Sequence, residues 1–232
     1  MPLLALAAAL VLVVAAGCDR LAALAASTPL QSFESRCEAL PLGEIAVVGL
    51  PIEVHEDYSV PYLELARLSE PGEVNHHTVG LTRAKFGYRS TIELGGLEDP
   101  RGGRACARPQ VRVEVEVTGM TVYVAREYRG DACREPLILD HERKHVAVFE
   151  TYAAEAAPAL ARELEGRVGR GVRYGPTIEA VQASLKRELS THLDAFMERS
   201  REELDRRHAA IDTRDEYDRI TRTCGSASDP AR

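Results

Sequence analysis

Five consecutive residues in the second half of the chain, His141-Glu142-Arg143-Lys144-His145, have the types and spacing needed for hydrolysis at a metal ion. Residues four apart share one face of a helix, so His141 and His145 can present two imidazole nitrogens to one ion. Glu142 can take a proton from a metal-bound water as that water attacks a carbonyl carbon. The segment therefore predicts His141 and His145 as Zn²⁺ ligands and Glu142 as the catalytic base.

The third protein ligand does not follow from these five residues, although a catalytic zinc ion normally has three protein ligands and one open position. No glycine and third histidine follow His145 at the spacing that would supply it. Five side chains further along the chain are candidates, and helix packing or surface exposure is an alternative interpretation of each: Glu155, Glu188, His192, His208 and Asp212. The pair His76-His77 is interpreted as a solvated turn.

A helix is expected to carry the motif, because apolar residues and histidines recur at helical spacing from Leu137 to Tyr152. Pro136 suits the first turn of this helix, and Pro158 is expected to kink or restart it before Leu164.

A second long amphipathic helix should follow a Gly- and Arg-rich loop at 166–175. Thr213 and Glu216 resemble a capping box for a last short helix that ends near Cys224. The apolar stripe of the long helix comprises Ile178, Val181, Leu185, Leu189, Phe196 and Leu204.

Strand signals dominate the first half of the chain, and the clearest is the alternation of valines with charged residues from Val111 to Val117. Thr118-Gly119 separates this run from a second one, Met120 to Ala125. A two-residue turn there would form a β-hairpin that pairs Val117 with Met120 and places all the valines and the methionine on one buried face.

Five cysteines are present, and four of them are expected to form two disulfides outside the cytoplasm. The predicted hairpin brings Cys106 and Cys133 nearly opposite each other, beyond the strand ends. We therefore expect Cys106–Cys133 and, as the remaining pair, Cys37–Cys224.

An export signal is predicted at the start, because residues 3–16 are all apolar but too few to span a bilayer. Ala15-Ala16-Gly17-Cys18 ends the apolar run and resembles the lipobox of bacterial lipoproteins. This resemblance implies that Cys18 is lipid-modified and anchors the protein in the cell envelope, facing the periplasm. An ordinary secretory signal is the alternative.

Composition sets the remaining limits. The 232 residues include 45% hydrophobic and 28% charged residues, as in a globular protein, and the formal charge of −7 argues against a nucleic-acid partner. We expect an α+β fold, with an antiparallel sheet or hairpin packed on long helices. The expected division is signal peptide 1–17, anchor and tether 18–43, one domain 44–224 (β-rich 44–130, helical 135–224), and disordered tail 225–232.

The motif is the zincin metallopeptidase signature. The wider segment, a cysteine-flanked hairpin followed by Leu139-Asp140 and the motif, resembles the bacterial secreted proteins described as predicted zinc-dependent proteases, the domain-of-unknown-function 922 group. The resemblance covers about residues 75–224 and implies a zinc peptidase. In zincins an edge strand before the active-site helix binds the peptide substrate, a role that Met120–Glu127 would fill. The alternative is a non-catalytic envelope lipoprotein that acts as a binding or assembly factor.

Overall fold

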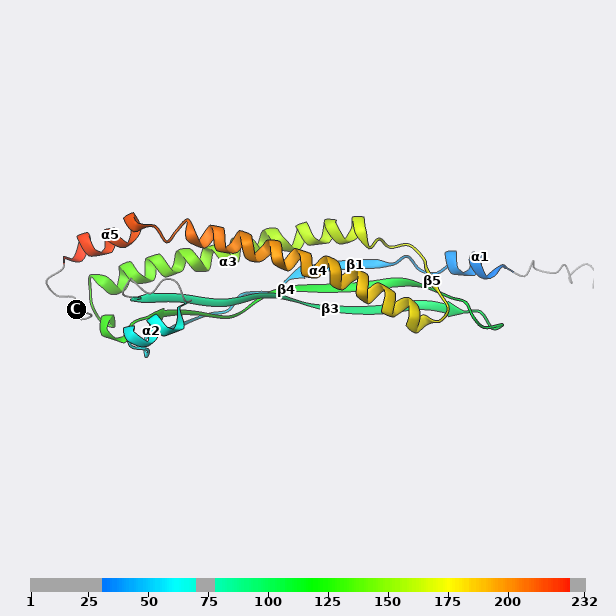
Figure 1. Cartoon of the computed structure of the whole chain (residues 1–232), viewed down its shortest axis with the longest axis horizontal. Coiled ribbons are helices and arrows are strands. Elements are labelled where there is room, and N and C mark those ends of the chain that lie inside the picture. Colours follow the sequence, from blue (N-terminus) through cyan, green and yellow to red (C-terminus); the bar gives the residue numbers. More distant parts are fainter. Residues whose placement is uncertain (1–30, 70–77, 226–232) are drawn as a thin grey trace, which may run out of the picture. The chain divides into compact units, whose positions relative to one another are not determined.

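The computed structural model of this chain describes residues 31–69 and 78–225 (Figure 1). The chain divides into two compact units between Ala39 and Leu40, and each is described by itself. The described part of the first unit holds α1 (Phe33–Glu38), whose N-cap Ser32 accepts a hydrogen bond from the Ser35 amide. The predicted signal peptide, Cys18, the His76-His77 pair and residues 226–232 of the predicted tail lie outside the described residues.

The second unit is α+β, as predicted, with its sheet in the N-terminal half and two long helices in the C-terminal half. Its elements in order are β1 (Glu44–Gly49), β2 (Val54–Asp57), α2 (Tyr62–Leu68), β3 (Gly80–Glu98), β4 (Ala105–Val124), η1 (Arg126–Tyr128), α3 (Arg134–Arg167), β5 (Arg173–Gly175), α4 (Ile178–Ala209) and α5 (Arg214–Cys224).

The sheet is built around β4, which pairs with every other described strand. β3 runs antiparallel along the whole of β4, from Gly80 opposite Val124 to Glu98 opposite Ala105. A strand has only two edges, so β5, β1 and β2 follow one another along the other edge. β1 and β2 are parallel to β4, which makes the sheet mixed rather than purely antiparallel.

The predicted hairpin at Thr118-Gly119 is wrong, because β4 runs through both residues as one strand. Between Arg83 and Lys85 of β3 the register on β4 moves from Thr121 to Thr118, so one extra residue is accommodated in β4 as a β-bulge. Gly119 has φ 63°, the left-handed conformation such a bulge requires. A two-residue turn and a one-residue bulge both place Val117 and Met120 on the same face of the sheet. The second half of β4 is therefore a central strand, and the predicted edge at Met120–Glu127 is wrong as well.

The buried face of β4 is the one that the alternation predicted: Val111, Val113, Val115, Val117, Met120, Val122 and Val124 are all buried. Helices α3 and α4 cover this face (Figure 1). The predicted stripe of α4 is largely confirmed, since Val181, Leu185, Leu189, Phe196 and Leu204 are buried. α3 continues through Pro158 as one helix, so the predicted kink or restart does not separate it into two.

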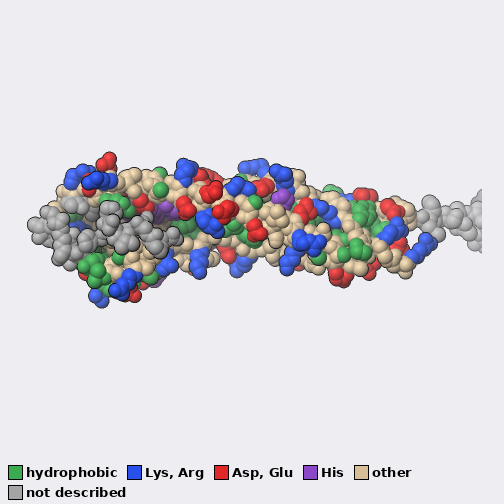
Figure 2. All heavy atoms as spheres, in the orientation of Figure 1, with side chains coloured by type: hydrophobic (Ala, Val, Ile, Leu, Met, Phe, Trp, Pro, Cys, Tyr) green, Lys and Arg blue, Asp and Glu red, His purple; other side chains and the backbone are tan. Residues whose placement is uncertain are grey.

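The predicted cap of the last helix is confirmed: Thr213 is the N-cap of α5, its hydroxyl accepts a hydrogen bond from the Glu216 amide, and the helix ends at Cys224. Acidic and basic side chains are interspersed over the face seen in Figure 2. Within the described residues, none of the helices combines the length and the apolar character needed to cross a bilayer.

All four cysteines of the described chain are oxidised to disulfides. One bridge joins Cys133 at the start of α3 to Cys224 at the end of α5. The predicted pairs Cys106–Cys133 and Cys37–Cys224 are therefore both wrong. The error follows from the hairpin: with β4 continuous, Cys106 lies at its far end, about 60 Å of extended chain from Val124.

Candidate metal centre

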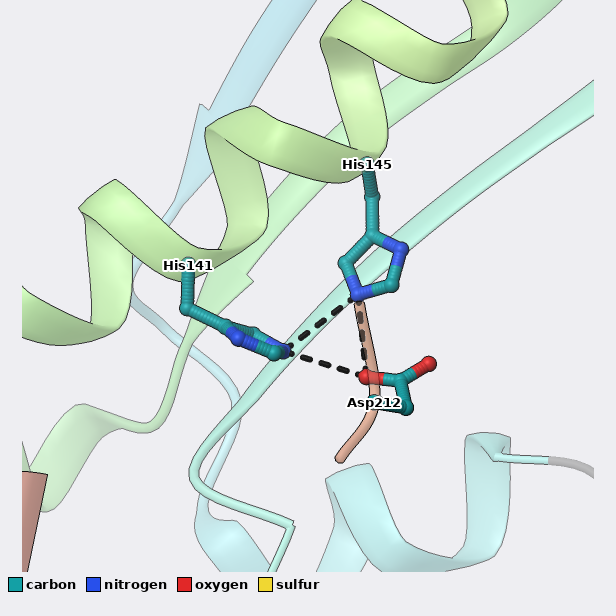
Figure 3. Close-up of side chains that lie close together, drawn as sticks. All are labelled: His141, His145 and Asp212. Atoms are coloured by element: carbon teal, nitrogen blue, oxygen red, sulfur yellow. Dashed lines mark hydrogen bonds and ion pairs between the residues drawn. The ribbon is translucent and has the colours of Figure 1, made fainter. Parts of the chain in front are cut away.

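Two imidazoles of α3 and one carboxylate from a distant part of the chain converge on one point. His141 and His145 extend from the same face of α3 toward Asp212, which lies between α4 and α5 (Figure 3). The His141 and His145 Nε2 atoms are 3.3 Å apart, and Asp212 Oδ1 is 3.2 Å and 3.1 Å from them respectively. Both histidines are buried, whereas the Asp212 side chain is 25% exposed, so the group is reached from solvent on the aspartate side.

The spacing of these three atoms fits a metal ion. Bonds of about 2.0–2.1 Å in a tetrahedral site place neighbouring ligand atoms about 3.3 Å apart. The three separations of 3.1–3.3 Å match this edge length, and each residue offers one ligand atom. Three protein ligands leave the fourth position of a tetrahedron for a water molecule or a substrate oxygen. His141, His145 and Asp212 can therefore hold a metal ion with one open position.

The outward-facing nitrogen of His145 has a hydrogen-bond partner of the kind that metal-bound histidines use, whereas that of His141 is buried with a carboxylate nearby and no hydrogen bond to it. His145 Nδ1 is 2.9 Å from His208 Nδ1, and His141 Nδ1 is 3.6 Å from Glu216 Oε1. A ligating histidine usually gives its other N–H to such a group, which fixes the tautomer and the ring orientation. Burial and the nearby His145 lower the pKa of His208 to about 4, so its neutral ring can accept this hydrogen bond.

Electrostatics favour an ionised carboxylate between the two rings. Burial raises the pKa of Asp212, but hydrogen bonds from His141 and His145 outweigh it, and the pKa is lowered overall. For His141, burial opposes the charged form, but the Asp212 hydrogen bond and the Glu142 charge raise its pKa overall. Without a metal the His141 ring, with its raised pKa, can balance the charge of the aspartate, and a divalent cation would take over that role.

Glu142 is held by the first residues of β3. Its Oε2 accepts a hydrogen bond of 2.8 Å from the Thr82 hydroxyl, and only 4% of the residue is exposed. A Cβ on Gly80 would lie 2.5 Å from Glu142 Oε1, so the missing side chain of this glycine makes room for the carboxylate. Burial raises the pKa of Glu142, with His141 and His145 acting in the opposite direction. A raised pKa makes the carboxylate a better proton acceptor near neutral pH.

Of the five candidates for the third ligand, the structure places Asp212 at the two motif histidines and His208 behind His145. Glu188 instead forms an ion pair with Arg173, and Glu155 with Arg207. His192 is not part of the group that could hold a metal.

Three contributors were not predicted as parts of the site: Thr82, Gly80 and Tyr217. The Tyr217 hydroxyl donates a 2.9 Å hydrogen bond to Asp212 Oδ1, and its ring centroid is 5.5 Å from that of His141. Thr82 and Gly80 precede the motif by about sixty residues, and no local pattern links them to it. The capping box did place Tyr217 on the last helix, close to a candidate ligand, and this was the one available signal.

Comparison of the chain with protein-family models, with curated proteins and with solved structures finds no match. The resemblance to predicted secreted zinc-dependent proteases therefore stays a prediction, and the functional argument rests on the geometry of the site.

Proposed function

We propose that this protein is a zinc-dependent hydrolase that cleaves peptides in the bacterial cell envelope. The observation that carries the proposal is the group of His141 Nε2, His145 Nε2 and Asp212 Oδ1 at mutual distances of 3.1–3.3 Å. Two imidazoles and one carboxylate are a common ligand set for catalytic zinc, which keeps one position open. When bound, zinc would lower the pKa of a water molecule and polarise a substrate carbonyl.

Side chains of the protein transfer the proton and position the reacting groups. Glu142, next to His141 on α3, takes the proton of the attacking water and passes it to the leaving amine. Thr82 holds one carboxylate oxygen of Glu142 and so limits its rotation. His208 orients the His145 ring from behind through the contact between their Nδ1 atoms.

The edge of the sheet next to the site supports an extended peptide as the substrate. β3 begins at Gly80, against Glu142, and its side away from β4 pairs with no strand among the described residues. A peptide could add to this edge through main-chain hydrogen bonds and pass close to the metal centre. β3 thus takes the role expected of Met120–Glu127. Attachment to the membrane through a lipid on Cys18 is part of the proposal and rests on the lipobox-like sequence alone.

The test separates metal binding from chemistry. Protein purified without chelators should carry about one zinc per chain, and alanine at His141, His145 or Asp212 should remove most of it. Glu142→Gln should keep the zinc, because it changes no ligand, and should lower peptide hydrolysis by about 10²–10⁴-fold for lack of a base. His192→Ala is the matched control, since it removes a histidine outside the group and should change neither property.

Zinc content is measured by elemental analysis and hydrolysis with an unstructured protein such as casein. A wild-type protein without bound zinc, or equal zinc in the His141→Ala variant, would refute the metal site. Zinc-loaded wild-type protein with no more activity than Glu142→Gln on a broad peptide library would leave a non-catalytic binding protein as the better interpretation.

A further inference from the structure

The third ligand is attached to an element with few apolar anchors. Asp212 immediately precedes Thr213, the N-cap of α5. None of the side chains that the structure describes on α5 is buried. Burial of an apolar face normally holds a surface helix in place, so at its described side chains α5 is attached to α3 by contacts of other kinds.

Polar contacts account for part of this attachment. Lys144 Nζ is 2.6 Å from Glu216 Oε1, and Arg219 Nη2 is 3.3 Å from Asp140 Oδ2. The Asp140 side chain is 60% exposed, so its pair with Arg219 stabilises little, whereas Glu216 is 16% exposed and its pair with Lys144 is the stronger of the two. Arg134 also donates a 2.8 Å hydrogen bond to the Gly225 carbonyl, next to the end of the helix.

The covalent attachment is the disulfide. Cys133 precedes the first residue of α3 and Cys224 is the last residue of α5, so the bridge fixes the far end of α5 to the start of the ligand-bearing helix. His141 lies two turns into α3, and Asp212 lies at the opposite end of α5. The segment that carries Asp212 is therefore held on one side by α4, which ends at Ala209. On the other side it is held by α5, whose far end is joined to α3 by the disulfide.

We infer that the Cys133–Cys224 disulfide is a positioning device for the metal site, so that metal affinity depends on the oxidation state of these two cysteines. The inference rests on the proposed metal-binding function. With the bridge open, α5 can leave α3 and take Glu216 and Tyr217 with it. Asp212 stays tethered through α4 but loses the hydrogen bond from the Tyr217 hydroxyl that orients it. Loss of such partners lowers metal affinity by about 10- to 100-fold.

The chemical step is a thiol–disulfide exchange. A dithiol reductant attacks one sulfur of the bridge, forms a mixed disulfide, and then closes to its own disulfide, releasing Cys133 and Cys224 as two thiols. Two electrons and two protons pass to the protein, and the reductant is oxidised by the same amount. Reoxidation restores the bridge and the metal affinity.

The experiment compares two double variants of the full chain. Cys133→Ser with Cys224→Ser opens this bridge without leaving thiols that could bind zinc themselves. Cys37→Ser with Cys106→Ser is the matched control, because it removes the same number of oxidised cysteines, with Cys106 at the other end of β4 from the site. Zinc dissociation constants are measured by competition with a chelator, and circular dichroism checks that each variant is folded.

We expect zinc to bind about 10- to 100-fold more weakly to the Cys133/Cys224 variant, and as in the wild type to the control. Hydrogen exchange at residues 212–224 should become faster in the first variant only, with β4 unchanged. Zinc affinity within twofold of the wild type in the Cys133/Cys224 variant would overturn the inference. If that variant loses helical signal, the bridge is instead opened in the folded control variant with a dithiol, and the thiols are blocked with iodoacetamide.

Failure of the inference can be told apart from failure of the proposed function. Zinc bound tightly by the wild type and equally by the Cys133/Cys224 variant refutes the positioning role and leaves the metal site intact. Absence of zinc from the wild type refutes the metal site. In that case, an unchanged hydrogen-exchange rate in α5 after removal of the bridge would also refute the claim that the disulfide holds α5 against α3.

Discussion

Replacing Gly80 with alanine tests how Glu142 is held. The added Cβ would lie 2.5 Å from Glu142 Oε1 and 2.6 Å from Ile138 Cγ2, well inside van der Waals contact. Gly80 is not in the left-handed region of φ, so the backbone itself can accept alanine and the effect is one of space. Overpacking of a filled core costs about 1–3 kcal/mol of unfolding free energy.

Gly87 provides a matched control on the same strand. A Cβ there has no atom within 4 Å, and its φ is also outside the left-handed region. Gly87→Ala should be neutral or slightly stabilising, because glycine in a strand costs more conformational entropy than alanine. Urea-induced unfolding of both variants gives the comparison directly.

A double variant separates the two close contacts of Gly80→Ala. In Gly80→Ala with Glu142→Ala the contact with the carboxylate is gone, while the contact with Ile138 remains. The combined loss of stability should therefore be smaller than the sum of the single losses, by about 0.5 kcal/mol or more. Equal stability of Gly80→Ala and Gly87→Ala would refute the steric argument, and strict additivity would show that Glu142 does not lie against Gly80.

Three further predictions use other contacts of the site and of the leader. Thr82→Val leaves the buried Glu142 Oε2 without its donor and should cost about 1–3 kcal/mol in urea unfolding, whereas Thr82→Ser should be nearly neutral; equal losses would contradict the hydrogen bond. Hydrogen bonds from Arg219 and Lys144 lower the pKa of Glu216 to about 2 from 4.5. The ionised Glu216 therefore contributes fully to the free energy of unfolding above pH 4.5, and this contribution is lost as the pH falls from 4.5 to 2. In metal-free protein the melting-temperature difference between wild type and Glu216→Gln should shrink over that range, and a constant difference would argue against this role. Cys18→Ser should release the protein from the membrane fraction or block its maturation, and fractionation like the wild type would refute the lipid anchor.

The parts of the fold that sequence patterns predicted are those set by local periodicity. The apolar stripe of α4, the cap at Thr213 and the buried face of β4 each depend on residues close together in the chain. The predicted hairpin was wrong because the valines and the methionine lie on the same face of the sheet with a two-residue turn as with a bulge, so the alternation pattern cannot distinguish the two. The residue types do argue against the hairpin, because a type I′ turn needs positive φ at both central residues and Thr118 is poorly suited to it.

The site shows the same division between local and distant information. His141 and His145 follow from helical spacing, whereas Asp212 is about seventy residues further on and reaches them only through the packing of α4 and α5 against α3. It was one of five candidates because the chain after the motif offers several carboxylates and histidines that spacing alone does not distinguish. The disulfide pairing depended on the hairpin, so that single error was carried into both bridges.

The central position of β4 has a consequence for how the chain must be assembled. Since β1, β2 and β3 each pair with β4 alone among the described strands, none of these three strands can join the sheet until residues 105–124 are available. β3 and β4 are joined by a short loop and can pair early. β1 pairs with the same strand across a much larger sequence separation, with Glu44 opposite Gln110, so its pairing is expected to be slower. The group that could hold a metal ion is completed later still in chain order, because Asp212 follows both long helices. Until β4 is available, the unpaired strands need protection from association with other chains.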